Sequence, residues 1–179
     1  MRCGDNEAVT RTARLAVDLV RPEEHARVGE LCVDAYRAAA ILAQDDGGYA
    51  AILRDVGHRA AETVVLVARE GGRVLGTVTL APPGSGYADI AAGDELEVRM
   101  LAVDPAAQRR GVAEALLRGA AEWAREQGYP ALVLSVLSVD GPGTPHRLYE
   151  RVGYRRVPAR DYIGAWDPAA LMWFYEHRV

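Results

Sequence analysis

Apolar residues recur along this chain with two different spacings, which predict strands and helices in turn. Residues 14–20 alternate between apolar and other side chains, as a half-buried strand does. Pro22 and two glutamates then open a helix, because proline and acidic residues favour the first helical turn. The apolar residues of this helix recur three or four positions apart and predict one buried face: Val28, Leu31, Cys32, Ala35 and Ala39.

The middle of the chain predicts a β-hairpin followed by another strand. Gly71-Gly72 joins two apolar runs, residues 63–70 and 73–81, and paired glycines favour a tight hairpin turn. We expect a further strand over residues 94–103 to pair with this hairpin. A shorter helix over residues 49–61 is predicted before it, and its buried side would carry Ile52, Leu53 and Val56.

The last third of the chain predicts a strand–helix–strand unit and a C-terminal extension. A helix over residues 109–127 leads to a nearly continuous apolar strand, residues 131–137, of the kind found in parallel sheets. A short helix over 146–152 and strands over 154–157 and 171–176 follow. This order predicts an α/β fold with a mixed sheet. The inward stripe of the long helix would contain Val112, Leu116, Gly119, Ala120 and Trp123.

The length, composition and charge of the chain exclude several classes of protein. A chain of 179 residues favours one domain with a substantial core, and its net charge of −4 argues against a nucleic-acid binder. The chain has no apolar run long enough to span a bilayer, so we expect no membrane contact. Residues 1–12 lack the apolar core of a signal peptide, so we expect a flexible leader, a domain over residues 13–179 and a cytoplasmic location. The four histidines lack metal-ligand spacing, so no metal site is expected.

The stretch from Glu97 to Ala113 concentrates the candidate chemistry. An apolar strand ends at Pro105, and the next helix opens with Gln108, Arg109 and Arg110 rather than with a side chain that caps helices. Arginines are unfavourable at the positive end of a helix dipole unless an anion binds there. We therefore infer a phosphate-bearing ligand at the start of this helix.

Two motifs in this half of the chain resemble the GNAT superfamily of acyl-CoA-dependent N-acetyltransferases. The first is the run from Leu101 to Ala113, with Gln108, two residues, Gly111, one residue and Ala113 in the signature positions. The second is Leu148-Tyr149-Glu150-Arg151-Val152-Gly153-Tyr154. The resemblance covers residues 14 to the C-terminus. It implies a single domain with a mixed, mostly antiparallel sheet of about six to seven strands, about four flanking helices and a splayed central parallel pair.

The resemblance also assigns the acetyl-CoA site to backbone groups. It implies that the Leu101 N–H stabilises the oxyanion of the transition state and that Val103 binds the pantetheine amide in the gap between the splayed strands. The backbone after the central strand would bind the pyrophosphate. Ala113 stands where many members have a second glycine. The residues assigned to acetyl-CoA are Leu101, Ala102, Val103, Gln108, Arg109, Arg110, Gly111, Val112, Ala113 and Glu114.

Two side chains are candidates for proton transfer. The resemblance makes Tyr149 the general acid that protonates the departing CoA thiolate; the alternative is a packed tyrosine whose hydroxyl bonds to backbone. It makes Glu97 the general base that acts through water on the amine. Two alternatives for Glu97 stay open, a structural ion pair with Arg99 and the attraction of a cationic acceptor.

The acceptor side is less defined by the sequence. The helix–loop–helix region supplies Tyr36, Tyr49, Asp45 and Asp46 as candidates, although a solvated loop also explains the two aspartates. Glu95 and Glu97 favour a cationic amine. The loop before Tyr149, Gly141-Pro142-Gly143, departs from the family, in which many members carry an asparagine there.

These features predict an N-acetyltransferase that transfers an acetyl group from acetyl-CoA to a primary amine by direct attack in a ternary complex. Its acceptor would be a small-molecule amine or a protein N-terminus, and a homodimer is left open. The alternative, which the unusual loop supports, is a catalytically silent acyl-CoA-binding regulatory module.

Overall fold

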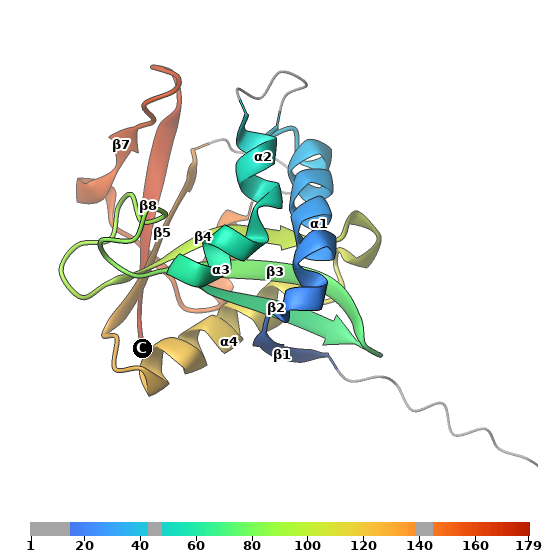
Figure 1. Ribbon diagram of the computed structural model, residues 1–179. Helices are drawn as coiled ribbons and strands as arrows, with labels where there is room; N and C mark the ends of the chain where they lie inside the picture. The colour runs from blue at the N-terminus through green and yellow to red at the C-terminus, as the bar shows by residue number, and fades with distance from the viewer. Residues whose placement is uncertain (1–14, 43–47, 139–144) are drawn as a thin grey trace, which may run out of the picture.

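The computed structural model describes residues 15–42, 48–138 and 145–179. These residues form five α-helices, eight strands and three short 3-10 helices (Figure 1). The strands are β1 (Ala16–Leu19), β2 (Val64–Glu70), β3 (Arg73–Ala81), β4 (Leu96–Val103), β5 (Ala131–Leu137), β6 (Arg155–Arg156), β7 (Tyr162–Ile163) and β8 (Leu171–Arg178). The α-helices are α1 (His25–Ala38), α2 (Tyr49–Arg54), α3 (Val56–Glu62), α4 (Val112–Glu126) and α5 (His146–Arg151). The 3-10 helices are Pro22–Glu24, Pro105–Ala107 and Pro158–Arg160.

All strands join one mixed sheet. Its order is β1-β2-β3-β4-β5-β8-β6, and β7 pairs with β8. Every neighbouring pair is antiparallel except β4 and β5, which are parallel and connected by α4. The expected mixed, mostly antiparallel sheet with a central parallel pair is confirmed. The two strands of two residues each, β6 and β7, bring the number of strands above the six to seven expected.

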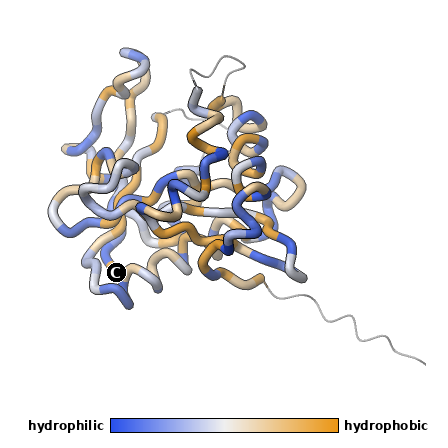
Figure 2. Tube along the Cα trace, in the orientation of Figure 1, coloured by the Kyte–Doolittle hydropathy of each residue, from blue (hydrophilic) through white to orange (hydrophobic). Residues whose placement is uncertain are grey.

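Helices cover both faces of the sheet, and each face has its own core. On the face that we call the α4 face, a cluster of buried residues joins α4 to β2–β5 and includes Leu116, Leu132 and Tyr149. On the opposite face, the α1 face, α1–α3 pack over Val67 and Met100. Figure 1 shows α1–α3 and α4 on opposite sides of β2–β4, and in Figure 2 the hydrophobic stretches follow these central strands.

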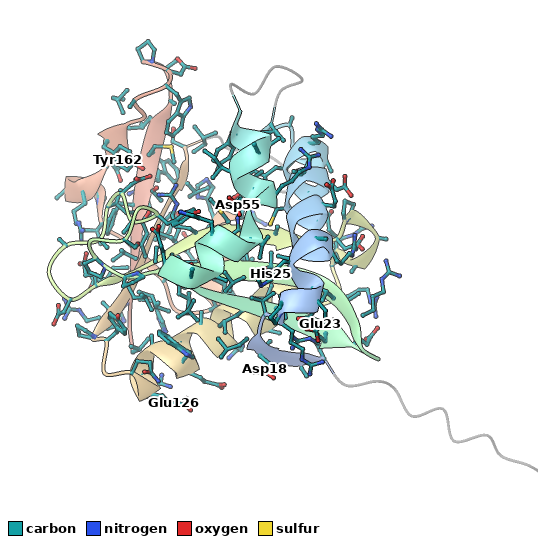
Figure 3. The ribbon with its side chains drawn as sticks, in the orientation of Figure 1. Asp18, Glu23, His25, Asp55, Glu126 and Tyr162 are labelled. Carbon is teal, nitrogen blue, oxygen red and sulfur yellow. The ribbon has the colours of Figure 1, made fainter. Side chains whose placement is uncertain are left out.

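Most element predictions hold, and the exceptions have local causes. The helix expected over residues 49–61 is two helices, because Asp55 ends α2 and its carboxylate accepts a hydrogen bond from the His58 N–H at 3.1 Å, which caps α3 (Figure 3). The break turns Ile52 outward, to 47% exposure, although Leu53 and Val56 are buried as expected. Ala39 lies beyond the end of α1 and is exposed.

The helix after the central strand begins at Val112, three residues later than expected. Its inward stripe is confirmed at Val112, Leu116 and Ala120, which are buried, whereas Gly119 and Trp123 are partly exposed. The expected leader over residues 1–12, Asp45, Asp46 and the loop Gly141-Pro142-Gly143 lie outside the described residues.

Candidate active site

The parallel pair at the centre of the sheet separates soon after it forms. β4 and β5 pair at only two positions, Leu96 with Leu132 and Glu97 with Val133. Beyond these, β4 continues along β3 to Val103, and β5 continues along β8 to Leu137. Figure 1 shows β5 and β8 running at a steep angle to β2–β4. The remaining residues of β4 therefore have one strand neighbour, and their other edge faces the gap.

A β-bulge interrupts β4 at the place where the strands separate. The pairing with β3 shifts between Thr77, opposite Ala102, and Thr79, opposite Arg99. Met100 lies in the left-handed region with φ of 50°, which costs a non-glycine residue on the order of 1–3 kcal/mol. The extra residue places Met100 in the core of the α1 face, while Leu101 packs against the core of the α4 face.

The backbone of β4 after the bulge presents polar groups to the gap. The Asp104 N–H donates to the Leu75 carbonyl on β3 at 2.8 Å. Because the N–H and C=O groups of successive strand residues point to opposite edges, those of Ala102 also face β3. Those of Leu101 and Val103 then face the gap on the β5 side. These are the groups that the sequence assigned to the thioester carbonyl and the pantetheine amide.

The turn into α4 contains two residues in the left-handed region and leaves the start of the helix without a side-chain cap. The Asp104 carboxylate caps the 3-10 helix Pro105–Ala107 by accepting from the Ala106 N–H at 3.0 Å. Arg109 has φ of 61° and Gly111, the N-cap of α4, has φ of 79° with no side-chain cap. Alternation of left-handed and right-handed residues makes a concave group of N–H donors that suits an anion. The first N–H groups of α4 add to it, so the geometry fits a pyrophosphate.

Several charged side chains around this turn form ion pairs with other side chains. Arg110 donates to Glu70 at 2.6 Å. Glu114, in the first turn of α4, pairs with Arg118 at 2.9 Å and with Arg151 at 3.3 Å. The hydrogen bond from Arg118 lowers the pKa of Glu114. Anion binding at this turn would therefore depend on backbone donors more than on free guanidinium groups.

Tyr149 lies on α5 and belongs to the core of the α4 face. Its side chain is 8% exposed and packs between Tyr154 and Tyr175, with ring centroids at 5.9 Å and 5.8 Å. Burial, and then the neighbouring Tyr175, raises the pKa of Tyr149, which keeps the phenol protonated at neutral pH. The described residues provide no hydrogen-bond partner for its hydroxyl. The role of Tyr149 as general acid stays a prediction, and so does the alternative of a packed tyrosine whose hydroxyl bonds to backbone.

Two tyrosines and an arginine gather on the α1 face beside the bulge. Tyr36 on α1 and Tyr49 on α2 have ring centroids 6.2 Å apart. Burial raises the pKa of Tyr36 well above its usual value, and Tyr49, Cys32 and Tyr149 raise it further, whereas Arg99 lowers it.

Glu97 is buried, and both oxygens of its carboxylate accept hydrogen bonds. It is 1% exposed, and its Oε2 accepts from the Asp89 N–H at 2.7 Å, the Ile90 N–H at 2.8 Å and the Ala91 N–H at 3.3 Å. Its Oε1 accepts from Arg99 Nη1 at 3.1 Å. This geometry favours the structural ion pair among the three roles considered for Glu97. The role of general base stays a prediction.

Comparison with known proteins decides the family. The sequence model of the acetyltransferase (GNAT) family matches residues 18–154 of this chain. The chain belongs to the GNAT family. No curated protein matches the sequence.

Solved GNAT structures share the fold at low sequence identity. A GNAT-family acetyltransferase from Desulfovibrio desulfuricans is 18% identical with a TM-score of 0.72, covering 92% of this chain and 99% of its own. An acetyltransferase from Brucella melitensis, in complex with acetyl-CoA, is 24% identical with a TM-score of 0.58, covering 80% and 84%. The PaiA N-acetyltransferase from Thermoplasma acidophilum, in complex with coenzyme A, is 12% identical with a TM-score of 0.70, covering 93% and 99%.

The fold brings the predicted site residues of this GNAT domain to two neighbouring places. Leu101 and Val103 present their backbone groups at the open edge of β4, Ala102 between them pairs with β3, and residues 108–114 form the turn and first turn of α4. Glu97 lies where β4 still pairs with β5, and Tyr149 belongs to the core of the α4 face. Val112 is one of the residues assigned to acetyl-CoA, but its side chain is buried in the core beneath α4. Only its backbone groups could therefore contact the cofactor.

Sequence reasoning missed two residues that shape the acceptor side. Arg160 donates to Glu95 at 2.6 Å and 2.9 Å and to the Ile90 carbonyl at 3.0 Å. It thus holds the same loop whose N–H groups bind Glu97. Arg99 was considered only as a partner of Glu97, although it also pairs with Asp89 on this loop. The separation of Arg160 from Glu95 by 65 positions leaves no local signal in the sequence.

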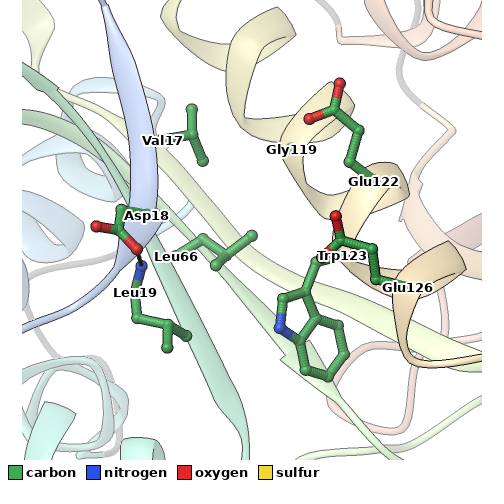
Figure 4. Close-up of a pocket in the computed structure, with 8 residues that line it drawn as sticks. All are labelled: Val17, Asp18, Leu19, Leu66, Gly119, Glu122, Trp123 and Glu126. Carbon is green, nitrogen blue, oxygen red and sulfur yellow. Dashed lines mark hydrogen bonds between the residues drawn. The ribbon is translucent and has the colours of Figure 1, made fainter.

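Two surface grooves lie away from the gap. One of about 300 Å³ runs between β1 and α4, with Leu66 as its floor and Leu19 and Trp123 at its sides (Figure 4). Another of about 330 Å³ is lined by residues of α2, α3 and Tyr87. Neither contains a residue assigned to acetyl-CoA. Within the described ranges, no cluster of three metal-ligating side chains and no helix long and apolar enough to cross a membrane is present.

Proposed function

We propose that this GNAT protein is an N-acetyltransferase that moves an acetyl group from acetyl-CoA to a primary amine in a ternary complex. The observation that carries the proposal is the gap between β4 and β5, with the backbone groups of Leu101 and Val103 facing it beside a concave N–H turn. An extended pantetheine arm can pair with the free edge of β4 as an added strand would. The pyrophosphate of the same molecule would then bind at the start of α4.

The proposed reaction follows from the groups around the gap. The amine lone pair attacks the thioester carbonyl carbon, and the carbon–sulfur bond breaks as the amide forms. The Leu101 N–H stabilises the negative charge that develops on the carbonyl oxygen. Tyr149 donates its proton to the departing thiolate. The contribution of Tyr149 is modest, near the lower end of the ~10²–10⁴-fold range of positioned acids, because a thiolate is a tolerable leaving group.

The amine must lose a proton before or during the attack. Glu97 is the carboxylate nearest the bulge in sequence, and it would act through water as the base. Its three backbone donors and Arg99 already occupy both oxygens of the carboxylate. We therefore propose that the chief role of Glu97 is to order residues 89–91 and Arg99, with base catalysis as its second role.

A thiol-release assay tests the proposed function. The purified protein is mixed with acetyl-CoA and a panel of primary amines and N-terminal peptides, and free CoA and the acetylated product are measured together. We expect amine-dependent CoA release matched by amide product. Acetyl-CoA binding without release for any amine would instead support the silent acyl-CoA-binding module. Absence of acetyl-CoA binding would contradict both functions.

A further inference from the structure

The two halves of the sheet are joined in different ways on its two faces. Within the described residues, β1–β4 and β5–β8 share two paired positions, Leu96 with Leu132 and Glu97 with Val133. The core of the α4 face contains residues of both halves, such as Leu96 and Leu132. Among the described residues, the core of the α1 face contains residues of β2, β3 and β4 but none of β5–β8. On the α1 face, the buried hydrophobic cluster therefore ends at β4.

Arg160 makes a polar connection between the two halves on the α1 face. Its guanidinium group donates to Glu95 at 2.6 Å and 2.9 Å and to the Ile90 carbonyl at 3.0 Å, in the segment that leads into β4. Its Cζ atom lies 3.8 Å from the centroid of the Phe174 ring on β8. Because Tyr175 belongs to the core of the α4 face, the adjacent Phe174 faces the α1 side. Arg160 thus bonds to one half of the sheet while it packs on the other.

The backbone at Arg160 is fixed to β8 beside the gap. The Val157 N–H donates to the Phe174 carbonyl at 3.0 Å, and the Arg160 N–H donates to the Val157 carbonyl at 2.9 Å. Phe174 lies opposite Ser135 on β5, which is two positions beyond Val133, the last residue of β5 that pairs with β4. Arg160 is therefore anchored beside the part of β5 that has separated from β4.

The bond to Ile90 continues from Arg160 to β4 itself. The Ile90 carbonyl accepts from Arg160, and the Ile90 N–H donates to Glu97 Oε2 at 2.8 Å. Glu95, the carboxylate partner of Arg160, also accepts from the Ala92 N–H at 2.9 Å. Hydrogen bonds to charged groups are stronger than those between neutral groups. A chain of such bonds therefore runs from β8 to Glu97, where β4 and β5 last pair.

We propose that Arg160 is a positioning residue that holds the two halves of the sheet at the separation that the pantetheine arm requires. This inference rests on the proposed binding of acetyl-CoA in the gap. Arg160 acts in this role through Glu95 and Ile90 rather than by contact with the cofactor. Without its bonds, the free edge of β4 would sample a wider range of positions relative to β5. Binding of the arm would then cost more conformational entropy.

Two probes that differ by the acetylated pantetheine arm test this role. Acetyl-CoA contains the nucleotide, the pyrophosphate and the arm, whereas 3′-phosphoadenosine 5′-diphosphate lacks the arm. In calorimetric titrations, Arg160→Gln should bind acetyl-CoA about fivefold to tenfold less tightly than the wild type does, because the gap is less preorganised. Its affinity for the nucleotide probe should stay within about twofold of the wild-type value, because the turn before α4 is unchanged.

Arg156→Gln is the matched control for the loss of an ion pair. Arg156 bonds to Asp161 at 2.6 Å and 2.8 Å, and its Cζ atom lies 4.4 Å from the centroid of the Trp173 ring. It resembles Arg160 in both kinds of contact, but its partners belong to the β5–β8 half alone. This control should keep the wild-type affinity for both probes, and thermal melting of each variant confirms folding.

Two further variants address the same ion pair. Arg160→Lys keeps the charge but lacks the planar group that reaches Glu95 and Ile90 together, so its affinity for acetyl-CoA should be intermediate. Glu95→Gln removes the charged partner and keeps the bond to Ile90. It should show the same selective loss, smaller at about twofold to threefold, and it replaces Arg160→Gln if that variant does not fold.

The outcomes separate this inference from the function beneath it. An equal loss of affinity for both probes in Arg160→Gln overturns the inference alone, because it indicates a general loss of structure. An unchanged affinity for acetyl-CoA, or an equal loss in Arg156→Gln, also overturns it. A wild-type protein that does not bind acetyl-CoA overturns the proposed function as well.

Discussion

The two faces of the sheet differ in the kinds of side chain that they bury. The core of the α4 face consists of aliphatic and aromatic residues from α4, α5 and the strands. Two of the four charged side chains that are buried in the described ranges bond to α1 or α2: Asp104 accepts from Arg27, and Arg59 donates to the Leu53 carbonyl. The other two are Arg69, which bonds to Glu24 just before α1, and Glu97, which bonds to residues 89–91. The cofactor turn leads into the helix of the apolar face, although the buried Asp104 at its start also pairs with Arg27 on α1. The proposed acceptor side is built around ion pairs.

This difference assigns two tasks to two kinds of chemical group. The proposed acetyl-CoA site uses backbone N–H and C=O groups, which any sequence with the same bulge and turn presents. The proposed acceptor site uses side chains whose positions depend on ion pairs, such as Arg99 with Glu97 and Arg160 with Glu95. Mutations in the turn should therefore affect cofactor binding alone, and mutations of the ion pairs should affect acceptor binding, stability and pH response together. Arg160 is the exception, because its mutation should also affect the binding of the pantetheine arm.

The largest expected effect is the loss of acetyl-CoA binding on Gly111→Glu. The substitution places a carboxylate and a strained left-handed residue where the pyrophosphate would bind, and we expect at least ~10³-fold weaker binding, about 4 kcal/mol. Gly128→Glu is the matched control, because Gly128 has φ of 81° against 79° for Gly111 and lies just beyond the other end of α4. Calorimetric titration should show near wild-type binding by the control. Equal loss in both variants would mean that backbone strain, not the anion site, is responsible.

Next in size is the effect of Tyr149→Phe on turnover. Removing the proton donor should lower kcat on the order of 10²-fold with little change in acetyl-CoA affinity. Tyr154→Phe is the control, since Tyr154 is in the same aromatic cluster and its buried hydroxyl has no hydrogen-bond partner among the described residues. It should retain kcat and melt at the same or a higher temperature, because a buried unsatisfied hydroxyl is lost. An unchanged kcat in Tyr149→Phe would remove the general acid from the mechanism.

Glu97→Gln should change the reaction rate less than Tyr149→Phe does. It should, however, clearly lower the free energy of unfolding. The amide keeps an acceptor for residues 89–91 but loses the charge that pairs with Arg99, so we expect about 2–3 kcal/mol of destabilisation by urea unfolding. The acidic limb of the pH–kcat/KM profile should keep its position. Loss of that limb, with a fall of more than ~10²-fold in kcat/KM, would show that Glu97 is the base.

The smallest expected effect is a loss of folding stability at acidic pH, caused by the protonation of paired carboxylates. The hydrogen bond from Arg69 lowers the pKa of Glu24; burial raises the pKa of Glu95, but its bonds to Arg160 and the Ala92 N–H outweigh burial and lower it. Because both pKa values are depressed on folding, this stabilisation is present above the ordinary value of 4.5 and is lost as the pH falls through the lower folded values. Urea unfolding between pH 7 and pH 3 should show a decline below about pH 4.5. The decline should be smaller in Glu24→Gln, and an equal decline would contradict this assignment.

The sequence predicted the parts that local chemistry determines. Gly71-Gly72 located the hairpin, Pro105 ended the central strand, and the apolar run over residues 131–137 gave the parallel strand with its observed bounds. The bulge has no local signal in the sequence, because Met100 is not a residue type that signals a positive φ. The pairing of Arg99 with Asp89 could not be predicted, because it joins a strand to a loop ten positions earlier in the chain. Tertiary contacts of this kind leave no repeating pattern of residues in the sequence.

Hydrogen–deuterium exchange with and without acetyl-CoA tests most directly whether the cofactor occupies the gap. We predict slower exchange at two segments, the backbone of residues 101–103 and of residues 109–114, because their N–H groups would bind the pantetheine arm and the pyrophosphate. Exchange in β1 and in the second half of α4, which border the groove on the α4 face, should not change. Protection confined to that groove, or no protection at residues 101–103 at saturating acetyl-CoA, would contradict the account.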